Sequence, residues 1–325
     1  MLKYNSIDPP FTIQELQTKS LFTYLAASNK LKNDFYCYDA NSKTLKEYNG
    51  IGHVVHPVKI FHIDFKKFGP FCENSEKTFC FTDCKNTLIV IDSEQIITRR
   101  QDVKALISDV AFDDIVSDHL YISDTNSDSV YLWNLKLTKL NESPIEISRF
   151  TLGRPFNLFA HEKYLIVTGS PEVEYRDIRH NEISQIKSTN CIYIIEKENT
   201  NKKKMIEFDD WFQPTGLNVD DYSHIYTIAY KLGPNKAILH VSLFILSFSG
   251  QKLKELPIDN LVSFKYVLIL NNKIIFSDDE RSKGLKTCSL RYSNNLNKKN
   301  TSIISLTDKK SSQSILSNLS YLSVN

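Results

Sequence analysis

Three cysteines lie close together in the first third of the chain. Cys72, Cys80 and Cys84 fall within thirteen residues, with seven and three residues between them. Zinc sites use Cys-x(2–4)-Cys pairs and need four ligands to be closed, so only Cys80 and Cys84 have a suitable spacing, and they supply half a site. Cys80 also alternates with Phe79 and Phe81 in a strand-like run, which turns its thiol away from the two rings. We therefore interpret these cysteines as small buried or half-buried thiols, and we expect core positions for the other three: Cys37, Cys191 and Cys288.

The histidines do not form a recognisable metal-binding motif. Three of them cluster in the first quarter of the chain (His53, His56 and His62), but no His-x-His or His-x-x-x-His pair occurs. Three others stand just before strand-like runs, where we expect solvated turn positions: His119, His161 and His224. The sequence therefore predicts no metal site.

Carboxylates recur at one position of a repeated pattern. Asp83, Asp124 and Asp278 each end a corresponding apolar run. Catalytic carboxylates would be paired and close, whereas one per repeat indicates a structural role, namely capping a turn through side-chain-to-backbone hydrogen bonds. No nucleophile elbow, phosphate loop or Cys/His dyad is found. The sequence therefore predicts no catalytic residue and no cofactor.

The composition is that of an ordinary globular protein. Of the 325 residues, 41% are hydrophobic, and 40 basic against 38 acidic side chains give a formal charge of +2. Bulk charge therefore indicates neither a nucleic acid nor a membrane as partner. The N-terminus is polar, the longest apolar stretch (240–248) is too short to span a bilayer, and six cysteines form no disulfide framework. We expect a cytoplasmic, monomeric protein without membrane contact.

The elements that position these residues repeat along the chain. Alternating apolar runs recur every forty to sixty residues, at 24–28, 79–83, 120–124, 164–169, 224–229 and 273–278. Each is followed after a polar turn by a second run, at 34–40, 87–93, 129–135, 191–197, 241–248 and 285–292. Such alternation is typical of half-buried strands, and such spacing is typical of propellers or solenoids.

Further runs flank these pairs. A short apolar run precedes most of them, at 56–64, 108–114, 154–162, 213–221 and 263–271, and a weaker run follows, as at 202–208 and 249–258. Each unit is therefore interpreted as four antiparallel strands, and no helical period longer than about ten residues is found. The predicted fold is all-β, a six-bladed β-propeller of four-stranded antiparallel blades.

Two segments resemble a known repeat. RPFNLFAHEKYLIVTG (154–169) and QPTGLNVDDYSHIYTIAY (213–230) look like the NHL-type propeller repeat, and ISDTNSDSVYLWNL (122–135) matches its later half. The resemblance extends from about residue 20 to 292, with degenerate first, second and sixth units and only nine glycines. SVYLWNL also resembles a WD-repeat strand, but no Gly-His dipeptide opens a predicted unit, which favours the NHL type.

Two enzyme families share this predicted architecture. Propeller lactonases similar to regucalcin bind a divalent ion partly through an Asn after an Arg-Pro pair; here Phe156 holds that position and Asn157 follows one residue later, on the opposite face of a strand. The later Pro-Asp-Gly is replaced by Pro214-Thr215-Gly216. A propeller lyase uses histidines on zinc, which the cluster at 53–62 would have to supply. Both metalloenzyme alternatives are therefore less favoured than a non-catalytic protein.

Closure of the ring is predicted from the C-terminus. We expect residues 1–325 to form a single propeller domain in which 315–325, and in particular a strand at 317–324, completes the first blade. Residues 293–312, rich in Asn, Lys and Ser, are interpreted as a polar connection.

A partner would bind at one loop-rich face. The longest insertions (170–190, 230–240 and 278–286) and the connections between units are predicted to gather there. The candidate contact residues are Arg154, Phe156, Tyr175, Arg176, Arg179, Trp211, Phe212, Tyr230, Lys231 and Arg281. Arg and aromatic side chains favour a protein partner, while single-stranded RNA remains the alternative. Trp211 and Phe212 have a second interpretation, in which they only seal adjacent blades. The Lys run at 202–204 is expected on an outer strand, solvated.

Overall fold

The computed structural model describes most of the repeated part of the chain. The described residues are 14–15, 22–29, 34–39, 44–48, 54–58, 69–83, 86–92, 97–102, 106–135, 145–169, 175–176, 183–184, 190–208, 212–232, 238–258, 264–270, 273–278 and 285–289. They all belong to one compact unit, residues 7–291; a second unit, residues 1–6 with 292–325, contains no described residue. The predicted connection at 293–312 and the predicted strand at 317–324 therefore lie outside the described residues.

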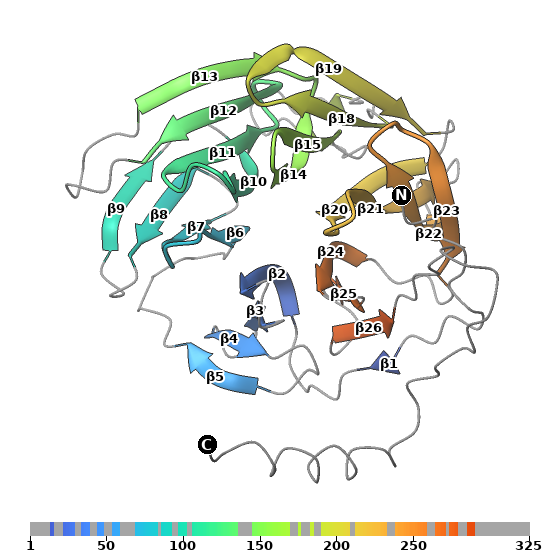
Figure 1. The fold of residues 1–325 in the computed structure, drawn as a ribbon, viewed down its shortest axis with the longest axis horizontal. Helices are drawn as coiled ribbons and strands as arrows, with labels where there is room; N and C mark the ends of the chain where they lie inside the picture. The colour runs from blue at the N-terminus through green and yellow to red at the C-terminus, as the bar shows by residue number, and fades with distance from the viewer. Residues whose placement is uncertain are drawn as a thin grey trace, which may run out of the picture. The chain divides into compact units, whose positions relative to one another are not determined.

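Four-stranded antiparallel sheets follow one another along this unit (Figure 1). The first sheet consists of β2 (Phe22–Asn29), β3 (Asp34–Asp39), β4 (Thr44–Tyr48) and β5 (Val54–Val58). The second consists of β6 (Phe71–Glu73), β7 (Phe79–Thr82), β8 (Thr87–Ile91) and β9 (Ile97–Asp102). The third consists of β10 (Ile107–Phe112), β11 (His119–Asp124), β12 (Ser129–Asn134) and β13 (Ile145–Thr151).

The later sheets have the same order. The fourth consists of β14 (Pro155–His161), β15 (Tyr164–Gly169), β18 (Cys191–Glu196) and β19 (Asn199–Glu207). The fifth consists of β20 (Phe212–Val219), β21 (His224–Leu232), β22 (Ile238–Ser247) and β23 (Lys252–Pro257). The sixth consists of β24 (Phe264–Leu270), β25 (Lys273–Asp278), β26 (Leu285–Ser289) and the N-terminal β1 (Gln14–Glu15). A two-stranded sheet of β16 (Tyr175–Arg176) and β17 (Ile183–Ser184) lies within the long insertion of the fourth sheet.

The predicted four-stranded antiparallel pattern is confirmed, and the paired runs that defined it are strands in all six sheets. The apolar, β-branched runs mark inner strands that pack on both faces: Leu120 and Ile122 of β11 pack against the second sheet, and Tyr121 packs against the fourth. The described residues contain no helix. No segment of the described chain is a helix long and apolar enough to cross a membrane.

The predicted phase of one unit is wrong. The run at 56–64 is predicted to open the second unit, but residues 54–58 form β5, the last strand of the first sheet, and the second sheet opens with β6. The run at 24–28, predicted to be a second strand, is the first strand of its sheet. The first sheet thus has four strands without the segment at 317–324. The prediction fails because the alternation of the run at 56–64 suits a first strand equally well, whereas β5 pairs with β4, which precedes it in the chain.

The hydrophobic core is divided among the interfaces between consecutive sheets. Cys80 and Leu88 of the second sheet pack with Val110 of the third, and Ile192 of the fourth packs with Phe244 of the fifth. Each such side chain contributes about 1.5–3 kcal/mol when it is fully buried. The first and last sheets share a cluster too, in which Phe35 and Tyr48 contact Leu268, Leu270 and Ile275.

The first strand of each sheet packs against the first strand of the next. These contacts run from β2 to β6, β10, β14, β20 and β24, and β24 in turn packs against β2. The N-terminal strand adds a backbone link, because β1 pairs with β26 through Gln14 opposite Thr287 and Glu15 opposite Lys286. The contacts between neighbouring first strands therefore hold consecutive sheets together.

The cysteines for which side chains are described occupy the predicted positions. Cys37, Cys80 and Cys191 are buried, and Cys72 is half-buried directly opposite Cys80. Burial raises the pKa of the Cys72 thiol, and the adjacent Cys80 raises it further. Such thiols are unreactive, which fits a packing role.

Candidate functional site

The registers of the sheets place the longest connections at a defined end. In the fourth sheet Pro155 pairs with Gly169, so the insertion at 170–190 leaves the sheet where β14 begins. In the fifth sheet Phe212 pairs with Lys231, so the connection at 233–237 leaves it where β20 begins. We call these ends of the fourth and fifth sheets the loop-rich end. All of the predicted contact residues except Arg281 belong in sequence to these strand ends and their connections.

Arg154 is held in place by the third sheet. Its backbone is in the left-handed region at φ 50°, directly after Gly153 at φ 69°. Its N–H donates to Oδ1 of Asp128 at 3.0 Å, and its Nε lies 3.9 Å from the same oxygen. The Arg154 side chain stays about one third exposed, at 31%. A partly neutralised guanidinium therefore remains accessible at the loop-rich end.

Phe156 anchors the same connection through its backbone. Its carbonyl oxygen accepts hydrogen bonds from Ser108 Oγ at 3.1 Å and Ser123 Oγ at 2.8 Å, both in the third sheet. The Phe156 side chain is half-buried. The start of β14 is thus fixed against the preceding sheet, which makes the loop-rich end a rigid base.

Phe212 and Lys231 form an aromatic and cationic cluster. The Phe212 ring makes edge contacts with Phe244 at 5.2 Å and His240 at 6.2 Å between centroids, and Lys231 Nζ lies 5.9 Å from its centroid. Lys231 is exposed, and Phe212 is half-buried against the core shared by the fourth and fifth sheets. Phe212 therefore does seal adjacent sheets, as its second interpretation proposed, while the ammonium group above it faces solvent.

The other predicted contact residues are less well placed or are not described. Tyr230 is buried, with 7% of its surface exposed, so its side chain is not available for contact. Tyr175 and Arg176 lie in β16, where only the backbone is described. Arg179, Trp211 and Arg281 lie outside the described residues.

A polar network joins three consecutive first strands. Asn157 in β14 donates from Nδ2 to Oδ2 of Asp109 in β10 at 3.3 Å, and its Oδ1 accepts from the N–H of Gly216 in β20 at 3.0 Å. Leu158 N–H also donates to Asp109 Oδ2, at 2.9 Å. Burial raises the pKa of Asp109 to about 7, although these donors oppose the rise. One asparagine therefore couples the third, fourth and fifth sheets.

This network bears on the lactonase alternative. Asn157 is buried, with 3% of its surface exposed, and both polar atoms of its side chain are engaged by the protein. The displacement of Asn157 relative to the lactonase pattern thus coincides with a structural role. Among the described residues no group of three or more His, Cys, Asp or Glu side chains is arranged to hold a metal ion.

Sequence reasoning missed this network, although a signal is present. Two of the three first strands carry one carboxyl or amide residue before an apolar one, Asp109 before Val110 and Asn157 before Leu158, whereas β20 contributes only the backbone N–H of Gly216. A polar side chain recurring inside an apolar run indicates a buried contact between sheets, since buried polar groups are hydrogen-bonded.

The predicted carboxylate caps are confirmed where their side chains are described. Asp83 Oδ1 accepts from Thr87 N–H at 3.0 Å, and Asp124 Oδ1 accepts from Asn126 N–H at 3.0 Å and Leu106 N–H at 2.9 Å. The side chain of Asp278 is not described. These carboxylates shape turns, as expected from one residue per repeat.

Two histidines expected in solvated turns are buried. His161 and His224 each keep 9% of their surface exposed. His224 Nδ1 lies 2.9 Å from Asp220 Oδ2, which also accepts from Tyr226 Oη at 2.9 Å. Burial alone would raise the pKa of Asp220, but His224 and Tyr226 outweigh it and hold that pKa below its usual value. The prediction is wrong because both residues belong to strands: His161 ends β14 and its ring contacts those of Phe159 and Phe248, and His224 begins β21.

Lys197 completes a second buried charged group at the end of the sheets opposite the loop-rich end. Its Nζ lies 3.1 Å from Asp113 Oδ2 and 2.6 Å from Asp114 Oδ1, and its side chain is 9% exposed. This ion pair joins the third and fourth sheets. As in the Asp220 group, the carboxylate also caps a turn, because Asp113 Oδ1 accepts hydrogen bonds from Ile115 N–H and Val116 N–H.

Comparison with known proteins identifies the fold. No protein-family model matches the chain, and no curated protein matches it in sequence. Similar solved structures include a catalytically inactive virginiamycin B lyase from Staphylococcus aureus with quinupristin, at 10% identity and a TM-score of 0.54, covering 86% of this chain and 100% of that one. U3-55K has 9% identity, a TM-score of 0.55 and coverages of 86% and 98%. The RRP9 WD40 repeats have 10% identity, a TM-score of 0.55 and coverages of 89% and 100%. The chain has a β-propeller fold.

Proposed function

We propose that the six sheets form a closed, six-bladed propeller that is most similar to the NHL type. Three observations support closure: β24 packs against β2, the first and last sheets share a hydrophobic cluster, and β1 pairs with β26. A closed ring covers the apolar faces that the first and last sheets would otherwise expose. The pairing expected from residues 317–324 stays a prediction, and closure through β1 does not require it.

We further propose that this propeller is a non-catalytic scaffold that binds a protein partner through its loop-rich end. The observation that carries this proposal is the cluster of Phe212, Lys231 and His240, with an exposed ammonium above a half-buried ring. Arg154 adds a guanidinium that is oriented by Asp128. Rigidly held aromatic and Arg side chains are the types that most often dominate binding energy at protein interfaces.

The other predicted contact residues stay predictions that rest on their place in the sequence. Tyr175, Arg176, Arg179 and Trp211 belong to the connections of the loop-rich end, and Arg281 belongs to the corresponding connection of the sixth sheet. Function is not fixed by the fold, and one structural neighbour is a lyase. The proposal therefore depends on side chains of this chain and on no neighbour's activity.

Charge reversal tests the surface directly. Wild type, the double variant Arg154→Glu with Lys231→Glu, and Lys163→Glu are compared as immobilised baits, and any recovered protein is purified and titrated against each. Lys163 is the matched control because it is exposed in the turn between β14 and β15, at the opposite end of its sheet. We expect the double variant to lose affinity at least tenfold and the control to bind like wild type. Equal binding by all three would contradict the proposal.

RNA is distinguished in a separate titration. Filter binding of a single-stranded RNA is measured at 50 mM and 200 mM salt, because phosphate contacts give a steep salt dependence. We expect no salt-dependent retention. RNA retention by the wild type that is lost in the double variant would indicate that this surface binds RNA and not a protein.

A further inference from the structure

Strand β19 lies at the outer edge of the fourth sheet (Figure 1). Among the described strands it pairs with β18 alone, with Tyr193 opposite Met205 and Ile195 opposite Lys203. Phe208 N–H donates to the carbonyl oxygen of Asn190 at 2.8 Å, which fixes the phase of the ladder. Hydrogen-bonded and non-hydrogen-bonded pairs alternate in antiparallel strands. The N–H and C=O groups of Lys203, Met205 and Glu207 therefore face away from the sheet.

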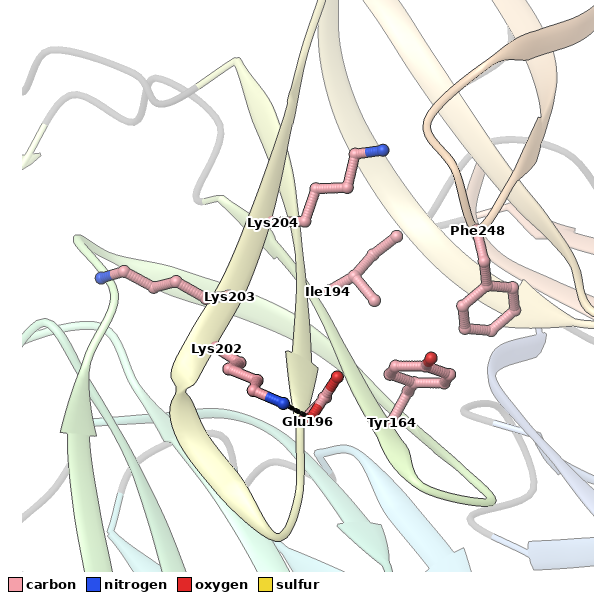
Figure 2. Close-up of a pocket in the computed structure, with 7 residues that line it drawn as sticks. All are labelled: Tyr164, Ile194, Glu196, Lys202, Lys203, Lys204 and Phe248. Atoms are coloured by element: carbon pink, nitrogen blue, oxygen red, sulfur yellow. Dashed lines mark ion pairs between the residues drawn. The ribbon is translucent and has the colours of Figure 1, made fainter.

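The side chains of this edge are strongly basic. Lys202, Lys203 and Lys204 are all exposed, and Met205 is 47% exposed. Because side chains alternate along a strand, Lys202 and Lys204 lie on the side of Ile206, which is buried against the fifth sheet. Figure 2 shows Lys203 pointing away from the other side chains. Basic groups thus flank the open backbone edge on both sides.

A cavity of about 430 Å³ opens beside Lys202 and Lys204 (Figure 2). Its apolar part is formed by Ile194, Tyr164 and Phe248, and the ring centroids of Tyr164 and Phe248 are 5.1 Å apart. Lys202 pairs with Glu196, the one acidic residue in the lining, at 3.4 Å. Lys203 and Lys204 have no carboxylate partner among the described residues, and Lys204 Nζ donates to the Ser249 carbonyl. The lining therefore has a positive charge next to an apolar recess.

We propose that β19 binds an extended, acidic segment of another protein, which adds a fifth strand to the fourth sheet and places an apolar side chain against the mouth of the cavity beside Lys202 and Lys204. A peptide backbone pairs with the outward groups of Lys203 and Met205, and carboxylates on the cavity side of the peptide pair with Lys202 and Lys204. Strand addition of this kind takes affinity from main-chain hydrogen bonds and specificity from alternate side chains.

The charges favour this occupant over a second copy of the chain. Two β19 strands side by side would oppose six lysines, and lysine on an edge strand prevents such self-association. An acidic strand reverses that repulsion. The edge is separate from the loop-rich end, so the two proposals succeed or fail independently.

The probe is a fluorescein-labelled ten-residue peptide in which Glu and Thr alternate and one central Glu is replaced by Phe. Its Glu and Phe side chains share one face when it is extended, as the lysines and the cavity require. Fluorescence anisotropy is measured at 50 mM and 300 mM salt. We expect binding by the wild type that weakens about tenfold in the higher salt. The same peptide with Lys in place of Glu serves as the charge control and is expected not to bind.

Backbone pairing is tested with a proline. Met205→Pro removes an outward N–H without breaking a hydrogen bond to β18, whereas Met205→Ala keeps it. We expect at least a tenfold loss of affinity for Met205→Pro and less than twofold for Met205→Ala. Equal affinities would overturn strand addition. If Met205→Pro fails to fold, two N-methylated probes are used instead, each methylated on every second backbone amide in one of the two possible sets. Loss of affinity for only one of these probes supports the proposal. No loss of affinity for either probe overturns it.

Charge is tested by Lys202→Glu combined with Lys204→Glu, with Lys231→Glu at the loop-rich end as the matched control. We expect the double variant to lose binding and the control to retain it. A probe that does not bind the wild type, or a ten-nucleotide RNA that binds β19 more tightly than the peptide, would overturn the proposal.

Discussion

Asp109 predicts an unusual dependence of stability on pH. Its carboxyl group accepts from Leu158 N–H at 2.9 Å and from Asn157 Nδ2 at 3.3 Å, but burial dominates and raises its pKa from the ordinary 3.8 to about 7. Between these two values the folded protein keeps a proton that the unfolded chain has already released. The free energy of unfolding contributed by this group is therefore greatest below pH 4 and falls as the pH rises to about 7.

The magnitude follows from the width of that window. Each pH unit changes the free energy of unfolding by about 1.4 kcal/mol, so a shift of roughly three units sets an upper limit of about 4 kcal/mol. Asp109 keeps part of its surface exposed, which reduces the penalty for the charged form, and we expect about 2 kcal/mol. Asp109→Asn removes the titration while keeping an oxygen that can accept from Leu158.

The assay compares urea unfolding of wild type and Asp109→Asn at pH 5 and pH 8. We expect the wild type to lose about 1 kcal/mol more than the variant between the two conditions, because part of the effect is already lost below pH 5 and other titrating groups contribute equally to both proteins. Asp221→Asn, which changes an exposed carboxylate in the turn after β20, is the control and should follow the wild type. Parallel pH profiles for the wild type and Asp109→Asn would refute the reasoning.

Three further substitutions test the contacts between sheets by urea unfolding at pH 7. Asn157→Ala should cost about 2–4 kcal/mol, because it leaves the buried N–H of Gly216 unsatisfied and breaks the link to the third sheet; a cost below 1 kcal/mol would contradict the network. Lys197→Met should cost about 3 kcal/mol, because the buried Asp113 carboxylate loses its cation, and an unchanged midpoint would show that the ion pair contributes nothing. Gly250→Ala should cost about 1–2 kcal/mol, because φ is 80° and the new Cβ would lie 3.2 Å from a β19 side chain; a more stable variant would exclude this strain.

Strand identity is predictable because the inner strands are short apolar runs rich in β-branched and aromatic residues, which pack against neighbouring sheets. The runs at 120–124 and 129–135 are separated by a short polar turn, so that their pairing as neighbouring antiparallel strands is predictable, and the structure adds the register, with Tyr121 opposite Leu132. The phase of the first unit cannot be predicted in this way, since alternation says which residues share a face and not which strand they pair with. The run at 56–64 shows the difference.

The candidate surface is predictable only in part. Arg154 and Lys231 are accessible where their loop positions indicate, whereas Tyr230 is buried although it is the neighbour of Lys231 in the chain. Adjacent residues of a strand face opposite ways, so a set of residues drawn from one sequence segment includes both. His224 is misplaced for another reason: its partner Asp220 lies four residues earlier, and a short turn between them buries both.

The pairing of Gln14 with Thr287 has a consequence for how the chain acquires its structure. This contact joins positions near the two ends of the repeated region, so the entropy of closing so long a loop must be overcome before β1 contributes any stability. During synthesis β1 must wait, unpaired, until residues 285–289 have left the ribosome. Under tension applied between the two ends, β1 and β26 would separate first, and the other sheets would then unravel one at a time.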